Sequence, residues 1–213
     1  MTGELGQLAL CLAFALAVVQ ALSGFIGASQ ANVRMMAMTR GAAMGAFVFT
    51  ALAFFTLMFA YVISDFSVLA VAQNSHTAKP LIYKISGVWG NHEGSMLLWL
   101  LILSVYSAAI AVTQPSGADN NARLAARALG VQALIAIAFL AFVLLTSDPF
   151  ARTYPPPFEG AGLNPLLQDP ARHDALAATL AAPLAMRQQA SKAAQAAKVM
   201  ATKVDFFTMV RGE

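Results

Sequence analysis

Four long stretches of the chain contain no charged residue and no histidine, and more polar segments separate them. Each is close to the roughly 17 to 25 residues that an α-helix needs to cross a bilayer. Stretches this apolar are expected to insert into a membrane without help. The pattern predicts an all-α integral membrane protein whose four transmembrane helices are centred on Leu5 to Ile26, Ala42 to Ile63, Met96 to Val112 and Ala128 to Thr146.

Composition supports a membrane protein. Hydrophobic residues make up 59% of the chain and charged residues 11%, whereas a soluble domain is about 25% charged. The first apolar stretch has no basic segment before it and no Ala-x-Ala-like site after it, so we expect a retained signal anchor instead of a cleaved signal peptide. Residues 1–146 are thus predicted to form one four-span bundle.

Basic residues predict the orientation of this bundle. Arg34 and Arg40 lie between the first two stretches, and Arg123 and Arg127 lie between the last two. Loops rich in arginine stay in the cytoplasm. Residues 64–95 carry two lysines and two acidic residues, which suits the other side. The N-terminus and everything after the fourth helix are then expected to be extracytoplasmic.

The composition changes twice after the fourth helix. Residues 147–170 are rich in proline, and Pro155 to Pro157 favour polyproline II over helix. We expect an extended extracytoplasmic strap. Residues 171–213 are rich in alanine and carry six basic and three acidic residues. Leucines four residues apart predict a C-terminal amphipathic helix there, interrupted by Pro183: Leu176, Leu180 and Leu184.

Cysteine usage and charge exclude several classes of function. Cys11 is the single cysteine, so the chain has no internal disulfide, zinc knuckle or Cys-x-x-Cys pair. Without Cys-x-x-Cys-His it cannot attach haem covalently. The basic residues form no clustered patch of the kind that nucleic acid requires, so nucleic acid is not expected as a partner.

A polar cluster immediately precedes the third apolar stretch: Trp89-Gly90-Asn91-His92-Glu93-Gly94-Ser95. It resembles the Trp-Gly-Gly-His-Glu-Gly-Ser segment of the CcmF family, with Asn91 replacing one glycine. Further blocks resemble the same family in the same order: Asp65-Phe66-Ser67-Val68, Asn74-Ser75-His76-Thr77, Pro149-Phe150, Pro155 to Pro157, and Leu163 to Pro170.

The resemblance implies a multi-pass protein of the bacterial inner membrane, with a periplasmic N-terminus, that acts in cytochrome c maturation. Implied partners are other maturation subunits, a haem chaperone, apocytochrome c and membrane lipid. The implied chemistry is lyase-type: haem is delivered to apocytochrome c and ligated to it.

The resemblance ends near Pro170. In the family, a His-Pro-Pro segment with a haem-ligating histidine and a tryptophan-rich haem-binding loop follow. His173 stands near the first of these positions, but no proline follows it, so the ligand role is not carried over. The chain looks like the N-terminal portion of a CcmF-type subunit, truncated or frame-shifted after Pro170, with residues 171–213 showing no family resemblance. The alternative is a genuine short homologue. We expect this chain alone to carry out only part of the family's function.

Four residues are the candidates for facing haem: Trp89, His92, Glu93 and Trp99. If the third helix begins a turn early, Trp89, His92, Met96 and Trp99 share one face and can line a porphyrin. The alternative is an ordinary interfacial aromatic belt. His92 and Met96 lie on one helix face and cannot reach both sides of a haem, so a second segment would have to complete the site. Glu93 stands at the positive end of the helix, where an anion is favoured. The alternative to a haem-facing role is that Glu93 and the flanking glycines form only a capping arrangement.

One weaker motif concerns helix packing. Gly41-Ala42-Ala43-Met44-Gly45 is a small-xxx-small motif, which points to close helix packing.

A small transporter or channel subunit is the rival function, supported by four spans and a polar helix mouth. Against it, none of the four apolar stretches carries a charge, although ion and proton pathways usually need one.

Overall fold

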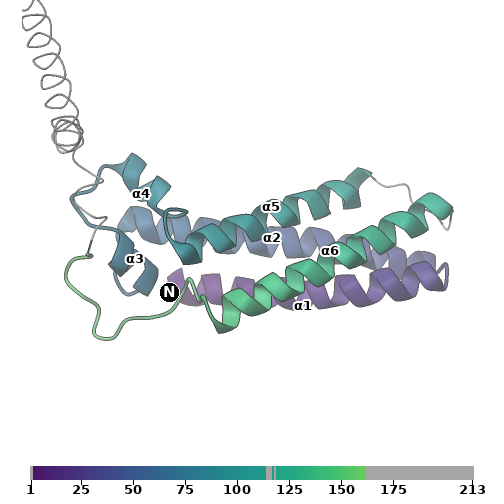
Figure 1. The fold of residues 1–213 in the computed structure, drawn as a ribbon, viewed down its shortest axis with the longest axis horizontal. Coiled ribbons are helices and arrows are strands. Elements are labelled where there is room, and N and C mark those ends of the chain that lie inside the picture. The colour runs from purple at the N-terminus through teal and green to yellow at the C-terminus, as the bar shows by residue number, and fades with distance from the viewer. Residues whose placement is uncertain (1, 114–116, 118, 162–213) are drawn as a thin grey trace, which may run out of the picture. The chain divides into compact units, whose positions relative to one another are not determined.

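The computed structural model describes residues 2–113, 117 and 119–161, and among these it contains helices and no strand (Figure 1). Six helices follow one another: α1 Thr2–Ser29, α2 Val33–Ile63, α3 Leu69–Asn74, α4 Leu81–Gly87, α5 His92–Thr113 and α6 Asn120–Leu145. Of these, α1, α2, α5 and α6 are long and apolar enough to cross a membrane. The predicted all-α membrane fold with four spans is confirmed. The predicted C-terminal helix and the boundary at Pro170 lie outside the described residues.

The spans extend beyond the charge-free stretches, and capping interactions set the ends of α2. Asn32 caps α2, and its side-chain oxygen accepts hydrogen bonds from the backbone N–H groups of Arg34 and Met35. This helix therefore encloses both Arg34 and Arg40 in its first turns. It ends at Ser64, whose φ of 57° is left-handed and terminates the helix.

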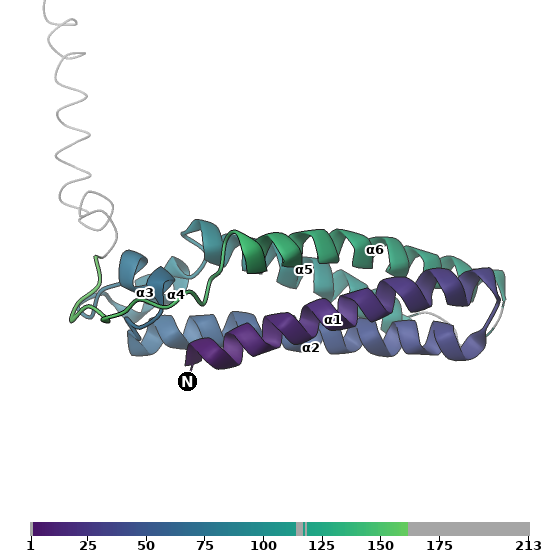
Figure 2. The ribbon, with the colours of Figure 1, turned by 90° about the horizontal axis from the view of Figure 1, so that it is seen from below.

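The four spans form an antiparallel bundle in which α1 packs against α2 and α6 (Figures 1 and 2). Helix α5 packs against the same two neighbours, so α1 and α5 lie diagonally across the bundle. The buried positions of α1 are mostly small residues, including Ala9, Ala13 and Ala17. Small side chains let membrane helices approach closely, where lipid supplies no hydrophobic drive for their association.

Only one of the two glycines in the Gly41–Gly45 motif takes part in a close contact between helices. A Cβ on Gly41 would meet nothing within 4 Å, while one on Gly45 would lie 2.9 Å from the Leu16 side chain. Backbone meets backbone between α1 and α6 instead, where a Cβ on Gly24 would lie 2.7 Å from the Ala126 carbonyl oxygen. The motif predicts packing correctly for Gly45 and wrongly for Gly41, which is exposed.

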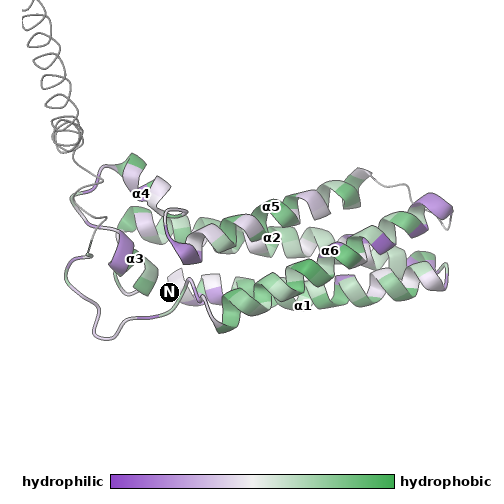
Figure 3. Cartoon of the chain, in the orientation of Figure 1, coloured by the Kyte–Doolittle hydropathy of each residue, from purple (hydrophilic) through white to green (hydrophobic). Residues whose placement is uncertain are grey.

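One end of the bundle carries α3, α4 and a strap formed by residues 147–161, and we call it the capped end. It lies near the start of α1, and Figure 3 shows hydrophilic residues there on α3 and at the start of α5. Backbone hydrogen bonds fasten the strap to the segment before and within α3: Leu69 N to Ala151 O, Thr153 N to Ser67 O, and Ala161 N to Ala72 O, at 2.7 to 3.0 Å. The predicted non-helical strap is present as far as the described residues extend.

Candidate functional site at the capped end

Helix α5 begins at His92, so Trp89 lies before the helix. The shared face from Trp89 to Trp99 required an earlier start, and that condition is not met. Asn91 explains the difference, because its side-chain Oδ1 accepts a 2.7 Å hydrogen bond from the backbone N–H of Gly94. This is an N-cap interaction, and it fixes the first turn of α5 at His92.

The candidate haem-facing side chains lie on open surface. His92 is exposed, and its ring stands edge-on to Phe142 of α6, with centroids 6.2 Å apart and planes at 88°. Trp99 is 64% exposed and Trp89 is 43% exposed. Met96 is half-buried between the levels of His92 and Trp99. His92, Met96 and Trp99 therefore lie on the same side of α5, whereas Trp89 precedes the helix.

Glu93 is half-buried in the first turn of α5. A carboxylate there is favoured by the helix dipole by about 0.3 to 1 kcal/mol. The side chain that caps the helix is Asn91, not Glu93. The capping arrangement expected of this cluster is therefore present, with a different residue at its centre.

Sequence reasoning missed the partner of Asn91. Its side-chain Nδ2 donates to the hydroxyl of Tyr61 and to the Gly87 carbonyl. Tyr61 is fully buried at the end of α2, and its hydroxyl donates in turn to the Ala70 carbonyl at 2.9 Å. One amide and one phenol thus join α2, α3 and α5. The replacement of a glycine by Asn91 was the one signal in the sequence that could have pointed to this link.

Gly94 fits its place because it has no side chain. A Cβ there would lie 1.6 Å from the carbonyl oxygen of Val88, a distance that no packed atoms tolerate. Val88 itself is fully buried. The glycine lets the turn before α5 press directly against the helix.

An electrostatic cluster joins α1 to the strap. The Thr2 hydroxyl and the Ser67 hydroxyl both donate to the Asp65 carboxylate. Arg152 pairs with Glu4 and donates to the Ser67 hydroxyl oxygen at 2.9 Å. Burial raises the pKa of Asp65, but hydrogen bonds from Ser67 and Thr2 and the nearby Arg152 outweigh it and leave that pKa below its ordinary value.

Three more ionisable groups lie at the capped end. Lys79 is 7% exposed and donates to the Asn74 carbonyl at 2.7 Å, and burial lowers its pKa. Glu159 accepts from the Thr77 hydroxyl at 2.7 Å, which lowers the pKa of this carboxyl, and it lies 3.6 Å from the His76 ring. The side chain of His76 is 40% exposed beside this carboxylate.

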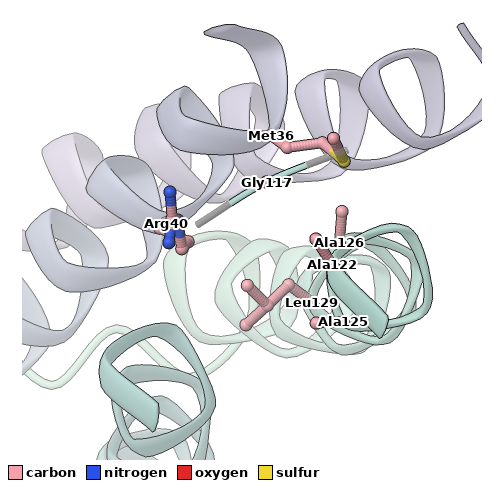
Figure 4. Close-up of a pocket in the computed structure, with 7 residues that line it drawn as sticks. All are labelled: Met36, Arg40, Gly117, Ala122, Ala125, Ala126 and Leu129. Carbon is pink, nitrogen blue, oxygen red and sulfur yellow. The ribbon is translucent and has the colours of Figure 1, made fainter. Parts of the chain in front are cut away.

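The opposite end of the bundle contains a small cavity, shown in Figure 4. Met36 and Arg40 of α2 face Ala122, Ala126 and neighbouring residues of α6 across it. It has about 10 Å³ of room for water centres, far too little for a porphyrin. The described residues also contain no group of three or more histidine, cysteine or carboxylate side chains placed to hold a metal ion. Exposed aromatic residues at the capped end can offer one wall for a flat aromatic ligand. An open hollow of about 420 Å³ also lies there, between the start of α1 and the strap.

Comparison with known proteins finds similarity to one family of membrane proteins over most of the chain. Over 166 residues, 78% of this chain, it is 54% identical to the cytochrome c-type biogenesis protein CycK of Rhizobium meliloti, of which the match covers 24%. It is 42% identical over 172 residues to the cytochrome c-type biogenesis protein CcmF of Escherichia coli, covering 80% of this chain and 26% of that protein. The chain is a relative of the CcmF family.

The solved structure of the cytochrome c haem lyase CcmF superimposes with a TM-score of 0.65 at 27% identity, covering 70% of this chain and 25% of that one. The chain thus spans about a quarter of the length of the CcmF relatives that it matches. Residues 160–212 match a different family, described as Phosphonate metabolism protein PhnG. The sequence analysis found no resemblance in most of that segment, which lies almost entirely outside the described residues.

Proposed function

We propose that this chain takes part in cytochrome c maturation, in the delivery of haem to apocytochrome c and its ligation there. The observation that carries the proposal is identity of 41 to 54% with CcmF and CycK proteins over about four fifths of the chain. Haem is the substrate in this proposal. Partners would be the other maturation subunits, a haem chaperone and apocytochrome c, in the inner membrane of a bacterium.

The proposed haem-facing surface consists of His92 and Trp99 on α5, with Trp89 and Glu93 at its mouth. In support, His92, Trp89 and Trp99 expose imidazole and indole surface at the capped end, and aromatic faces suit a flat apolar ring. Only 28% of the most apolar window of α5 is buried, compared with 44% for α1. Much of this helix is therefore open to lipid or to a further protein surface that would complete the site.

The strap supplies a candidate contact for protein partners. Tyr154 is 96% exposed and Phe158 is fully exposed, while the strap around them is held by backbone hydrogen bonds. Exposed aromatic residues on a fixed backbone are typical of binding surfaces. With the N-terminus in the periplasm, this surface would face apocytochrome c.

Complementation tests the function. In a full-length CcmF relative, the matching segment is replaced by residues 2–161 of this chain and expressed in a strain lacking its own CcmF. We expect restored c-type cytochromes by haem staining. The same chimaera with His92→Ala should give less c-type cytochrome while bound haem remains visible in its absorption spectrum.

The matched control is His76→Ala, which removes the other histidine of the capped end and should leave the yield unchanged. Normal levels of a chimaera that restores no haem staining would contradict the function. Complete loss of the haem spectrum in the His92→Ala chimaera would show that His92 is indispensable for holding haem, contrary to a shared site. A chimaera without any haem spectrum would favour the transporter alternative.

A further inference from the structure

A seam of polar side chains crosses the middle of the bundle. Gln20 of α1 is 3% exposed, and its amide nitrogen donates to the Ser107 hydroxyl of α5 and to the Leu129 carbonyl of α6, both at 2.9 Å. One side chain therefore reaches the diagonal helix and a neighbouring one. In hydrocarbon, every such polar group needs a partner inside the protein.

Two hydrogen-bonding groups beside this seam lack a partner among the described residues. Gln132 of α6 donates through its amide nitrogen to the Leu103 carbonyl at 3.1 Å, but its buried amide oxygen accepts nothing there. Ser107 accepts from Gln20, and within the described part of the chain its own hydroxyl hydrogen has no acceptor. One group is an unused acceptor and the other an unused donor.

Both side chains line the same cavity. All four spans contribute polar residues to it: Gln20, Thr50, Ser104, Ser107 and Gln132. The cavity has about 20 Å³ of room for water centres, and a single water requires roughly 10 to 15 Å³ by this measure. The rest of its lining is alanine and leucine. A water is therefore held there only if the few polar groups supply the two to four partners that a buried water needs. The space admits one water and excludes larger ligands.

Depth separates this cavity from bulk solvent. Gln132 lies twelve residues from Asn120, the start of α6, and thirteen from Leu145, its end. At 1.5 Å per residue it stands about 18 Å from the start of the helix, near the middle of the bilayer core. A water there would be a resident of the fold and not part of the surface hydration.

We propose that the bundle binds one structural water between Ser107 and Gln132. The water accepts the Ser107 hydroxyl hydrogen and donates to the Gln132 amide oxygen. Its second hydrogen donates to the amide oxygen of Gln20, which lines the same cavity. Three helices, α1, α5 and α6, are then joined through one molecule, and this holds whether or not the chain handles haem.

Ser104 provides a matched control because it lines the same cavity one turn away. Its hydroxyl already donates to the Leu101 carbonyl at 2.8 Å. Ser107→Ala and Ser104→Ala remove the same atom from the same helix, but only the first removes a partner of the proposed water.

The test is solid-state NMR of the full chain in lipid bilayers, measuring magnetisation transfer from water to side-chain amides of glutamine. We expect transfer to the Gln132 amide in the unmodified chain. Ser107→Ala should reduce it at least about twofold, because the water loses one of its three partners, and Ser104→Ala should leave it unchanged. Absence of transfer in the unmodified chain overturns the proposal, as does an equal loss in both variants. The unmodified chain decides the matter even if a variant fails to fold.

Discussion

The side-chain amide of Asn91 donates a hydrogen bond to the hydroxyl of Tyr61, thirty residues earlier in the chain. The same asparagine caps α5 through its oxygen, so one residue both starts a span and ties it to the end of another. Tyr61 carries the link on to α3 through the Ala70 carbonyl. The polar mouth of α5 is therefore held in place by α2, the longest helix among the described residues.

Tyr61→Phe should destabilise the chain more than its single lost oxygen suggests. The change removes two hydrogen bonds from a buried place, each worth about 0.5 to 1.5 kcal/mol, so the cost should be about 1 to 3 kcal/mol. The Ala70 carbonyl keeps its bond from the Asn74 amide, and the Asn91 amide keeps its bond to the Gly87 carbonyl. Unfolding in mixed micelles with increasing denaturing detergent measures it. Asn91→Gly should cost about 1 to 2 kcal/mol through the cap and the same hydrogen bond. The two losses should not add in the double variant, and full additivity would show that the pair is not coupled.

Gly94→Ala should cost at least about 3 kcal/mol, the upper range for overpacking, because its Cβ would lie 1.6 Å from the Val88 carbonyl oxygen. The control is Gly41→Ala, also within a span, where a Cβ meets nothing within 4 Å. There we expect a gain of about 0.5 to 1 kcal/mol, since alanine is the better helix former. The unfolding midpoints of both variants test this, and equal effects would refute the close contact at Gly94.

Stability of the capped end should fall in acid. The folded-state pKa of Asp65 is below its ordinary value of 3.8, so its contribution is present above that pH and is lost as the pH falls through the folded value. Thermal unfolding from pH 6 down to pH 3 should show the loss. Asp65→Asn should flatten this dependence in part, because the pKa of Glu159 is lowered too. An unchanged pH dependence in Asp65→Asn would contradict the role given to the Thr2 and Ser67 hydrogen bonds.

The orientation in the membrane remains a prediction from the arginine distribution. In a Cys11→Ala background, Ala78→Cys places a thiol at the capped end and Asn121→Cys places one at the opposite end, both at exposed positions. In intact cells an impermeant thiol reagent should label the first and not the second. Labelling of Asn121→Cys alone would reverse the assignment.

The spans were predictable from sequence because each rests on one strong physical requirement, an apolar length that fits the bilayer. The starts of α2 and α5 were not, since Asn32 and Asn91 set them through side-chain hydrogen bonds. The expected face from Trp89 to Trp99 failed for that reason. Gly24 also escaped notice, because its close partners, Ala126 and Gly130, are a hundred residues away on α6. Long-range contacts of this kind leave no local pattern in a sequence.

The candidate haem-facing residues also show what the sequence could and could not predict. The segment around His92 is recognisable by its composition, and its exposure agrees with a surface that meets something else. Which side chain would face haem depends on what lies opposite α5, and no property of the residues in α5 encodes that. The role of Trp89, His92, Glu93 and Trp99 therefore stays a prediction for the chimaera to test.

The strap follows α6 in the chain but is hydrogen-bonded to residues 67–72 and paired with α1 through Arg152 and Glu4. A partner that grips Tyr154 or Phe158 would consequently pull on the beginning of the bundle and not only on the helix that leads into the strap. Mechanical load applied at this one projection is divided among α1, α3 and α6. A protein bound to Tyr154 or Phe158 would therefore move α1, α3 and α6 together.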